Sequence, residues 1–189
     1  GDVTLRVPGR HSVYNALAAI AVGLEFDIRY QDIVAHLADF SGADRRFQHK
    51  GTVNDIMVID DYGHHPTEIR ATLAAAAEGW RRRVVVIFQP HRYSRVQSLM
   101  DEFARSFYQA DVVIVTDIYR AGEEPIPGVT GEALTAAIKQ HGHRDTTYAR
   151  SLEEALRLAR EKARPGDMVV TLGAGDVGRI GERLLKDAA

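Results

Sequence analysis

Apolar and polar residues alternate in blocks along most of this chain, in a pattern typical of strands followed by helices. From about Lys50 onward, short runs rich in Val and Ile end abruptly and lead into segments with helical spacing. The runs predict buried strands at 56–59, 83–88, 111–116, 146–148 and 167–172. The intervening segments predict helices at 67–80, 96–108, 131–140 and 152–163, with a terminal helix after 178. This alternation predicts βαβ crossovers and a doubly wound, mostly parallel α/β sheet.

The first fifty residues carry a less regular pattern. They predict a strand at 3–7, a helix at 16–24 with Ser12 as its N-cap, a second helix at 30–37 and an irregular stretch at 40–47. Because the regular alternation begins only after this part, we place a domain boundary near Gly51. The expected domains are therefore residues 1–50 and residues 51–189.

One stretch, from Asp55 to Pro66, carries the strongest functional signal. Its sequence, DIMVIDDYGHHP, reads as a buried strand that ends in two acidic residues, a tyrosine, a glycine and two histidines. Pro66 suits the first turn of a helix, where a missing N–H costs little, and Glu68 suits the positive end of that helix. Ligands of open α/β sheets bind outside the carboxyl ends of the strands. A capped turn with exposed histidines is the alternative, but this combination of residues favours a functional site.

Polar loops follow the other predicted strands, and in a parallel sheet they all face one edge. His91, Arg92 and Arg95 come directly after the strand at 83–88, where two guanidinium groups can bind a carboxylate or a phosphate. The alternative is that they cap the next helix or pair with surface acids. A further loop is long enough to fold over a ligand and contains Tyr119, Arg120, Glu123 and Glu124.

Two further motifs each allow two interpretations. The adjacent Arg45 and Arg46 form either a solvated basic turn or a phosphate clamp. The motif Gly173-x-Gly175-x-x-Gly178 would by itself suggest a dinucleotide site. However, no later strand follows to carry a ribose-binding acid, and Asp176 sits where an anion would approach. The glycines are therefore expected to allow close packing and a tight turn beside a shared pocket.

Composition excludes several classes of protein. The 189 residues are 45% hydrophobic and 26% charged, which is ordinary for a globular protein. A formal net charge of −2 argues against a broad nucleic-acid-binding surface, and no apolar run is long enough for membrane insertion. The absence of cysteine excludes disulfides and thiolate chemistry and fits a reducing cytoplasm. No phosphate-loop or metal-ligand spacing occurs, so no metal site is predicted. The sequence starts at Gly1 and not at a methionine, which suggests part of a longer protein.

Six segments of the chain, taken in order, resemble the Mur ligase family. They are GRHSVYNALAA (9–19), RRF (45–47), DDYGHHPTE (60–68), FQPHRYSR (88–95), DIYRAGE (117–123) and GAGDVG (173–178). Together they span essentially the whole chain, and the combination of DDYGHHP with QPHRYSR is specific.

The resemblance implies both a fold and an activity. Family members have a UDP-sugar-binding domain, a central ATPase domain and a C-terminal Rossmann-like domain that receives the amino acid. Residues 1–50 would then be the tail of the ATPase domain, and residues 51–189 the Rossmann-like domain. The implied activity is an ATP-dependent, ADP-forming joining of L-alanine to UDP-N-acetylmuramate through an acyl phosphate, for peptidoglycan synthesis in the cytoplasm. The phosphate loop and the Mg²⁺ ligands would lie outside this chain, which is therefore expected to be inactive alone.

The resemblance also implies roles for individual residues. ATP would be bound by Asn15, Arg46 and Asp61, and L-alanine by Tyr62, His64, His91, Arg92 and Arg95. The catalytic residues would be His64, which accepts the proton of the amine, and Arg46, which stabilises charge on the phosphoryl group. The family usually carries Asn where this chain has Ser12. A serine cannot reproduce both hydrogen-bonding ends of an amide, so no nucleotide contact is assigned to that position.

Three alternatives remain open. A murein-tripeptide recycling ligase of the same family would perform the same chemistry on a peptide. A Rossmann-like oxidoreductase would use the glycine motif at 173–178 to bind its cofactor. A non-catalytic interaction domain would serve self-association.

Overall fold

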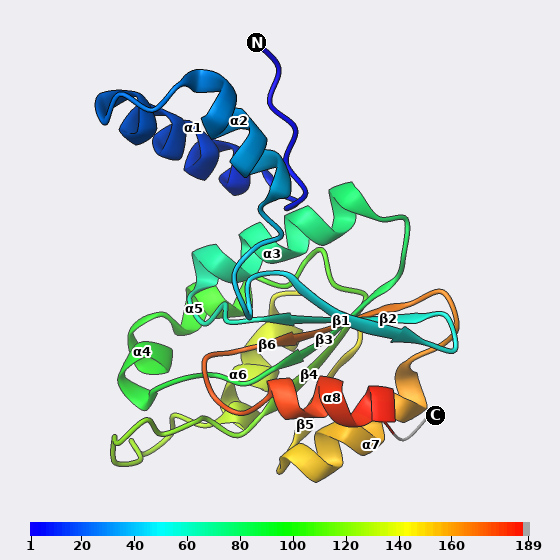
Figure 1. The fold of residues 1–189 in the computed structure, drawn as a ribbon. Helices are drawn as coiled ribbons and strands as arrows, with labels where there is room; N and C mark the ends of the chain where they lie inside the picture. Colours follow the sequence, from blue (N-terminus) through cyan, green and yellow to red (C-terminus); the bar gives the residue numbers. More distant parts are fainter. Residues whose placement is uncertain (187–189) are drawn as a thin grey trace.

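In the computed structural model, which describes residues 1–186, the predicted alternation of strands and helices is confirmed (Figure 1). The strands are β1 (Gln48–Val53), β2 (Ile56–Asp61), β3 (Val84–Phe88), β4 (Val112–Thr116), β5 (Thr146–Ala149) and β6 (Met168–Leu172). The helices that follow β2 are α3 (Pro66–Gly79), α4 (Tyr93–Ser98), α5 (Met100–Ala104), α6 (Gly131–Gln140), α7 (Leu152–Lys162) and α8 (Gly178–Lys186).

The strands form one six-stranded sheet in the order β1-β2-β6-β3-β4-β5. Only β1 is antiparallel to its neighbour, so the sheet is mostly parallel, as predicted. All residues of β3, β4 and β6 are buried, because helices cover both faces of the sheet. Helices α3 to α6 pack on one face around Phe88 and Phe103, whereas α7 and α8 pack on the other around Leu156 and Ile180. The sheet is therefore doubly wound.

The strand order reverses at the centre of the sheet. From β3 the chain moves outward through α4 and α5 to β4, and α7 then returns it from the edge strand β5 to the interior strand β6. Strands β3 and β6 are neighbours, and a hydrogen bond from Gln89 N to Leu172 O (2.9 Å) joins their carboxyl ends. The loops that follow these two strands then lead in opposite directions. A reversal of this kind is where ligands bind in open α/β sheets.

The first forty residues form a small helical unit above α3 (Figure 1). It contains α1 (Arg10–Glu25) and α2 (Tyr30–Asp39), which pack against each other. The strand predicted at 3–7 is wrong, since no other strand in the described part of the chain lies beside it to share hydrogen bonds. The prediction that Ser12 caps α1 is also wrong. The N-cap is Gly9, and the Ser12 hydroxyl donates to Pro8 O at 2.8 Å instead.

Two further differences concern single elements. The helix predicted at 96–108 is divided into α4 and α5 by a break at Leu99. Strand β1 was not predicted, because its sequence, QHKGTV, is mostly polar and lies at the edge of the sheet. Gly51 lies within β1, opposite Val58 of β2, so this strand runs across the expected domain boundary. The boundary itself stays a prediction.

No helix among residues 1–186 combines the length and the apolar character that crossing a bilayer requires.

Candidate functional site

The loop after β2 is organised around Asp61, which is only 5% exposed. One carboxylate oxygen accepts from Gly63 N and the other from Phe47 N, both at 2.7 Å. Burial raises the pKa of Asp61, and hydrogen bonds from Phe47, Gly63 and Thr72 oppose that rise. Asp61 therefore fixes the segment before β1 against the carboxyl end of β2.

Helix α3 begins as the sequence predicts, with Pro66 in its first turn. Its N-cap is His65, whose Nδ1 accepts from Thr67 N, while Glu68 accepts from the backbone N–H groups of His64 (2.9 Å) and His65 (3.1 Å). This capping box was not predicted, because histidine is not a usual N-cap residue. The cap fixes the course of the backbone through both histidines and thereby places the His64 ring.

A cavity of about 550 Å³ lies between the N-terminal helical unit and α3. It is lined by all three residues predicted to bind ATP, Asn15, Arg46 and Asp61, so the structure brings this set together. Arg46 is exposed and pairs only loosely with Glu68, at 3.7 Å, so its guanidinium can reach a ligand. Asp61 accepts two backbone hydrogen bonds, from Phe47 N and Gly63 N, which leaves about two of its roughly four acceptor positions free. A ribose hydroxyl at Asp61 stays a prediction.

Four aromatic rings form a row across the carboxyl edge of the sheet. Tyr62 meets His64 edge-on with ring centres 5.4 Å apart, and His64 lies 5.6 Å from His91. His91 in turn stacks on Tyr119 at 5.5 Å with an interplanar angle of 10°. The loops after β2, β3 and β4 each contribute to the row. The predicted amino-acid-binding residues Tyr62, His64 and His91 are therefore neighbours. No specific role was predicted for Tyr119.

The surroundings of His64 define which ring nitrogen can act as a base. Its Nδ1 lies 3.0 Å from the carbonyl oxygen of Tyr62 and 3.5 Å from a carboxylate oxygen of Glu68. Both oxygens only accept hydrogen bonds, so Nδ1 carries the proton of the neutral ring. The other nitrogen, Nε2, keeps its lone pair. This arrangement suits a general base, the role predicted for His64.

Two arginines flank His91. The Nη1 group of Arg95 lies 3.2 Å from both the Nδ1 and the carbonyl oxygen of His91. Burial lowers the pKa of His91, and positive charge on His64, Arg95 and Arg92 lowers it further, while Glu123 opposes the shift. Arg92 is exposed and has a φ of +71°, a conformation that costs about 1–3 kcal/mol in a non-glycine residue. Such strain is frequent where a loop presents side chains to a ligand.

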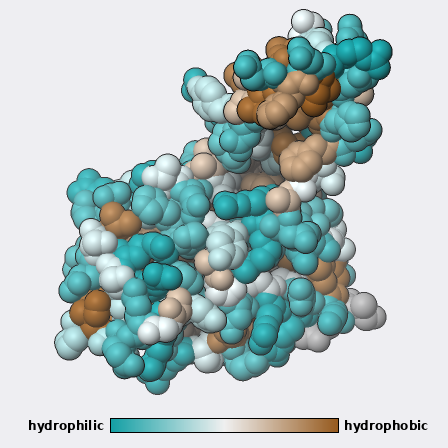
Figure 2. Space-filling view, turned by 60° about the vertical axis from the view of Figure 1, so that its left-hand side comes forward, coloured by the Kyte–Doolittle hydropathy of each residue, from teal (hydrophilic) through white to brown (hydrophobic). Residues whose placement is uncertain are grey.

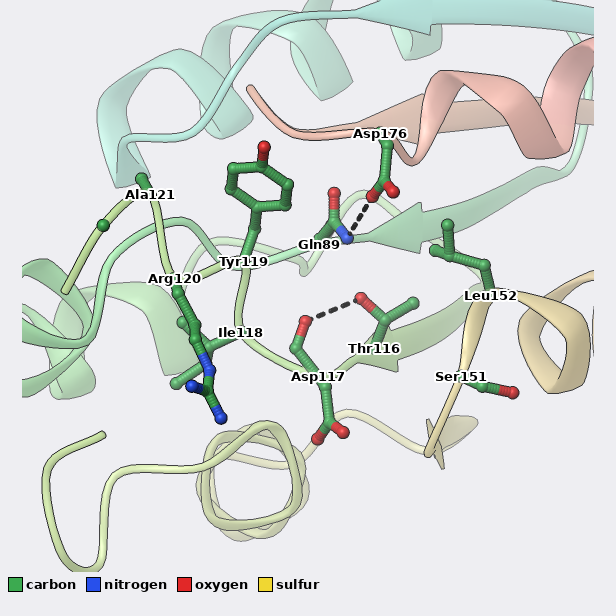
Figure 3. A pocket seen from close by; sticks show the side chains of 11 residues that line it. Gln89, Thr116, Asp117, Ile118, Tyr119, Arg120, Ala121, Ser151, Leu152 and Asp176 are labelled. Carbon is green, nitrogen blue, oxygen red and sulfur yellow. Dashed lines mark hydrogen bonds between the residues drawn. The ribbon is translucent and has the colours of Figure 1, made fainter. Parts of the chain in front are cut away.

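A second cavity, of about 510 Å³, opens at the carboxyl ends of β3, β4, β5 and β6 (Figure 3). Gln89 Nε2 donates to Asp176 at 2.8 Å on one side of it. On another side Asp117 accepts from the hydroxyl of Tyr148, and burial together with this bond raises the pKa of Tyr148 to about 12. The sequence indicated a shared pocket beside the glycine motif, but it gave no sign of these two pairs.

Arg45 and Arg46 have different surroundings, although both pack against the ring of Tyr62. Arg45 Nε donates to Asp60 at 2.9 Å, and its Nη groups donate to Gly173 O (2.6 Å) and Gly175 O (3.2 Å). Arg45 therefore fastens the glycine loop to β2, whereas Arg46 turns toward the 550 Å³ cavity. The glycine loop is closely packed, as predicted, because a Cβ on Gly175 would lie 2.3 Å from Gln89 Oε1.

Within residues 1–186, no group of three or more His, Asp or Glu side chains is arranged to hold a metal ion. The expectation that Mg²⁺ ligands lie outside this chain stays a prediction.

A doubly wound parallel sheet with bases, guanidinium groups and carboxylates along its carboxyl edge defines a ligand-binding α/β domain. The chain belongs to the Mur ligase family, because residues 45–175 match the family described as Mur ligase, glutamate ligase domain.

Named relatives make the comparison more specific. The chain is 54% identical over 186 residues to the UDP-N-acetylmuramate–L-alanine ligase of Geotalea daltonii, covering 98% of this chain and 41% of that protein. The crystal structure of the corresponding ligase of Thermotoga maritima superposes with a TM-score of 0.83 at 31% identity, covering 98% of this chain and 39% of the other. A murein peptide ligase of Psychrobacter arcticus gives a TM-score of 0.71 at 30% identity, with coverages of 97% and 38%. The chain therefore spans about two fifths of the length of these relatives.

Proposed function

We propose that this chain is the C-terminal part of an ATP-dependent ligase that joins L-alanine to UDP-N-acetylmuramate in the cytoplasm. The observation that carries the proposal is the arrangement of two residue sets around one loop. Asn15, Arg46 and Asp61 line the cavity beside α3, and the row from Tyr62 to His91 begins at the next residue after Asp61. A ligase of this kind must hold the phosphoryl donor and the attacking amine side by side.

The chemistry assigns a task to each side chain. A carboxylate is a poor acyl donor, so the reaction converts the muramate carboxylate to an acyl phosphate with release of ADP. The amine of L-alanine attacks this acyl phosphate, and phosphate leaves from the tetrahedral intermediate. His64 Nε2 takes the proton that the amine loses, because His64 Nδ1 is occupied by the carbonyl of Tyr62. Arg46 stabilises the negative charge of the phosphoryl group.

The side chain of L-alanine is only a methyl group, so most of the binding energy of this substrate must come from contacts with its carboxylate. Arg95 is positioned for this by its bonds to His91, and Arg92 is presented by the strained turn that begins α4. Guanidinium groups bind carboxylates with paired, charge-assisted hydrogen bonds.

The N-terminal helical unit fits a domain of which this chain holds only a part. Figure 2 shows hydrophobic side chains gathered on this unit. Several are half exposed or more, including Tyr14 (58%), Leu17 (56%), Val22 (57%) and Phe26 (75%). We propose that residues 1–50 complete a central ATPase domain whose other residues cover this surface and supply the phosphate loop and the Mg²⁺ ligands. Self-association through the same surface is the alternative.

The second candidate function is the ligation of a murein tripeptide, supported by the likeness to the Psychrobacter arcticus enzyme. The alanine ligase is favoured because relatives named for it reach 56% identity and the matched structure named for it superposes better.

The test is a substrate-dependence assay with a complete ligase that contains this chain. Release of ADP and phosphate is expected only when ATP, UDP-N-acetylmuramate and L-alanine are all present, with the amide product identified by mass. In parallel reactions the murein tripeptide replaces L-alanine. Turnover with the tripeptide and none with L-alanine would establish the second candidate instead of the first.

A further inference from the structure

Tyr119 lies between the cavity of Figure 3 and two of the predicted amino-acid-binding residues, His64 and His91. One face of its ring stacks on His91 at 5.5 Å. Tyr119 also lines the 510 Å³ cavity, whereas His91 does not. The ring is 41% exposed, and its hydroxyl has no hydrogen-bond partner among the residues described in the structure. The contribution of this side chain is therefore its bulk rather than a polar contact.

The ring is fixed in place from several directions. Tyr119 N donates to Pro90 O at 2.8 Å, and Tyr119 O accepts from Arg92 N at 2.9 Å. The loop after β6 closes over the ring so tightly that a Cβ on Gly175 would lie 2.8 Å from it. His91 lies against one ring face, so the side chain has little freedom to swing away. Tyr119 is therefore a wall between the 510 Å³ cavity and the ring of His91.

The space behind this wall is large compared with the proposed substrate side chain. L-alanine carries one methyl group, whereas the cavity of about 510 Å³ lies within the range of roughly 300–1,000 Å³ typical of small-molecule pockets. Ile118 and Leu152 contribute apolar surface to it. A larger apolar side chain would find room there if the wall were absent.

We propose that Tyr119 is a specificity-determining residue that restricts the proposed ligase to an amino acid with a small side chain. The inference rests on the proposed function. Tyr119 closes the cluster of His64, His91 and Arg95 against the neighbouring cavity, so a bulky side chain meets the ring. Replacing Tyr119 by alanine extends the 510 Å³ cavity to His91 and admits a side chain such as that of L-valine or L-leucine. The same change removes the stacking partner of His91, so the use of L-alanine itself declines.

The experiment compares kcat/KM for L-alanine, L-valine and L-leucine in a complete ligase that contains this chain. In Tyr119→Ala, the ratio of kcat/KM for L-valine to that for L-alanine is expected to rise by about 10-fold or more, since each methylene in an apolar pocket changes discrimination by roughly 10–200-fold. Tyr119→Phe keeps the ring and should keep the wild-type ratio. Tyr108→Ala serves as a matched control, because Tyr108 is 62% exposed and lines neither cavity.

The outcomes separate this inference from the proposed function. Thermal unfolding first confirms that each variant is folded, and if Tyr119→Ala is not, Tyr119→Leu, which is also smaller than tyrosine, replaces it. A folded variant that keeps the wild-type ratio, or that loses L-alanine activity without gaining L-valine activity, would overturn the assignment while the proposed function stands. Failure of the wild-type ligase to use L-alanine would overturn the proposed function and this inference with it.

Discussion

At the scale of single residues, the adjacent pairs Asp60–Asp61 and Arg45–Arg46 each contain one residue bound within the protein and one that faces the proposed site. Asp60 binds Arg45 and the Thr171 hydroxyl inside the protein, whereas Asp61 holds the loop that carries His64. Arg45 is likewise bound inside, to Asp60 and to the glycine loop, while Arg46 lines a cavity. Asp60 and Asp61 are consecutive residues of β2, so their side chains point to opposite sides. Arg45 and Arg46 diverge instead at a turn in which Arg45 has a φ of +56°. In each pair one member serves packing and the other faces the proposed site.

The arginines after β3 give the most direct test at this scale. In a complete ligase, Arg95→Ala or Arg92→Ala is expected to lower kcat/KM for L-alanine by roughly 10- to 200-fold, because a charge-assisted hydrogen bond contributes about 1.5–3 kcal/mol. Lysine restores the charge but not the two-pronged geometry, so the matching lysine variants should recover only part of the loss. The measurement is steady-state kinetics with each substrate varied in turn, and KM for ATP should change little.

Arg144→Ala provides the control, since this exposed arginine lies before β5, at the amino end of the strand. If both alanine variants behave like Arg144→Ala, then Arg92 and Arg95 only hold the loop.

The residue types of the site could be predicted from sequence, but their pairings could not. The two acids, the histidines and the arginines stand out because they follow apolar runs that predict strands. The bond from Arg45 to Gly173 O joins residues 128 positions apart, and no local pattern encodes it. Tyr119 was noted only as part of a loop, since its stacking on His91 depends on β3 and β4 being neighbours.

At the scale of elements, the glycine loop between β6 and α8 is defined by what packs against it. A Cβ on Gly175 would lie 2.3 Å from Gln89 Oε1 and 2.8 Å from the Tyr119 ring. Gly173 has a φ of +148°, and a Cβ there would lie 2.7 Å from Gln89 O. The glycines therefore let this loop lie directly on the loops after β3 and β4, with Arg45 fastening it from the other side.

Gly175→Ala tests this packing. The added methyl group must displace Gln89 or Tyr119, so the variant is expected to lose about 1–3 kcal/mol in the free energy of unfolding, as overpacked sites typically do. Gly79→Ala is the matched control, because a Cβ there meets nothing within 4 Å. Urea unfolding of both variants of this chain measures the difference. Equal midpoints and slopes for Gly175→Ala and the wild type would show that the loop is not tightly packed.

The elements that were predicted correctly have strong patterns of their own. Helix α6 matches its predicted bounds, and β3, β4 and β6 are almost entirely apolar because both of their faces are buried. Strand β1 escaped prediction because pairing with β2 outweighs its polar sequence. The apolar alternation at 3–7 predicted a strand that does not form, because no neighbouring strand is there to pair with its backbone.

At the scale of the whole molecule, the chain combines a complete sheet with an N-terminal unit that leaves much of its apolar surface exposed. The sheet has buried cores on both faces, whereas α1 buries only Ala16 and Gly23. The proposed ATP site lies where these two parts meet, and the proposed amino-acid site lies wholly within the sheet part. ATP binding by this chain alone is therefore expected to be weak, in the millimolar range, or about −4 kcal/mol.

The most direct measurement of the central claim is an NMR titration of this chain, in separate experiments, with ATP and with L-alanine. ATP is expected to shift the signals of Asn15 and Arg46, and L-alanine those of His64, His91 and Arg95, with little overlap between the two sets. Asp61 and Tyr62, where the sites adjoin, should respond to both ligands. Shifts from both ligands confined to the cavity of Figure 3, or micromolar ATP binding that leaves Asn15 and Arg46 unmoved, would contradict the placement of two adjoining substrate sites around the loop after β2.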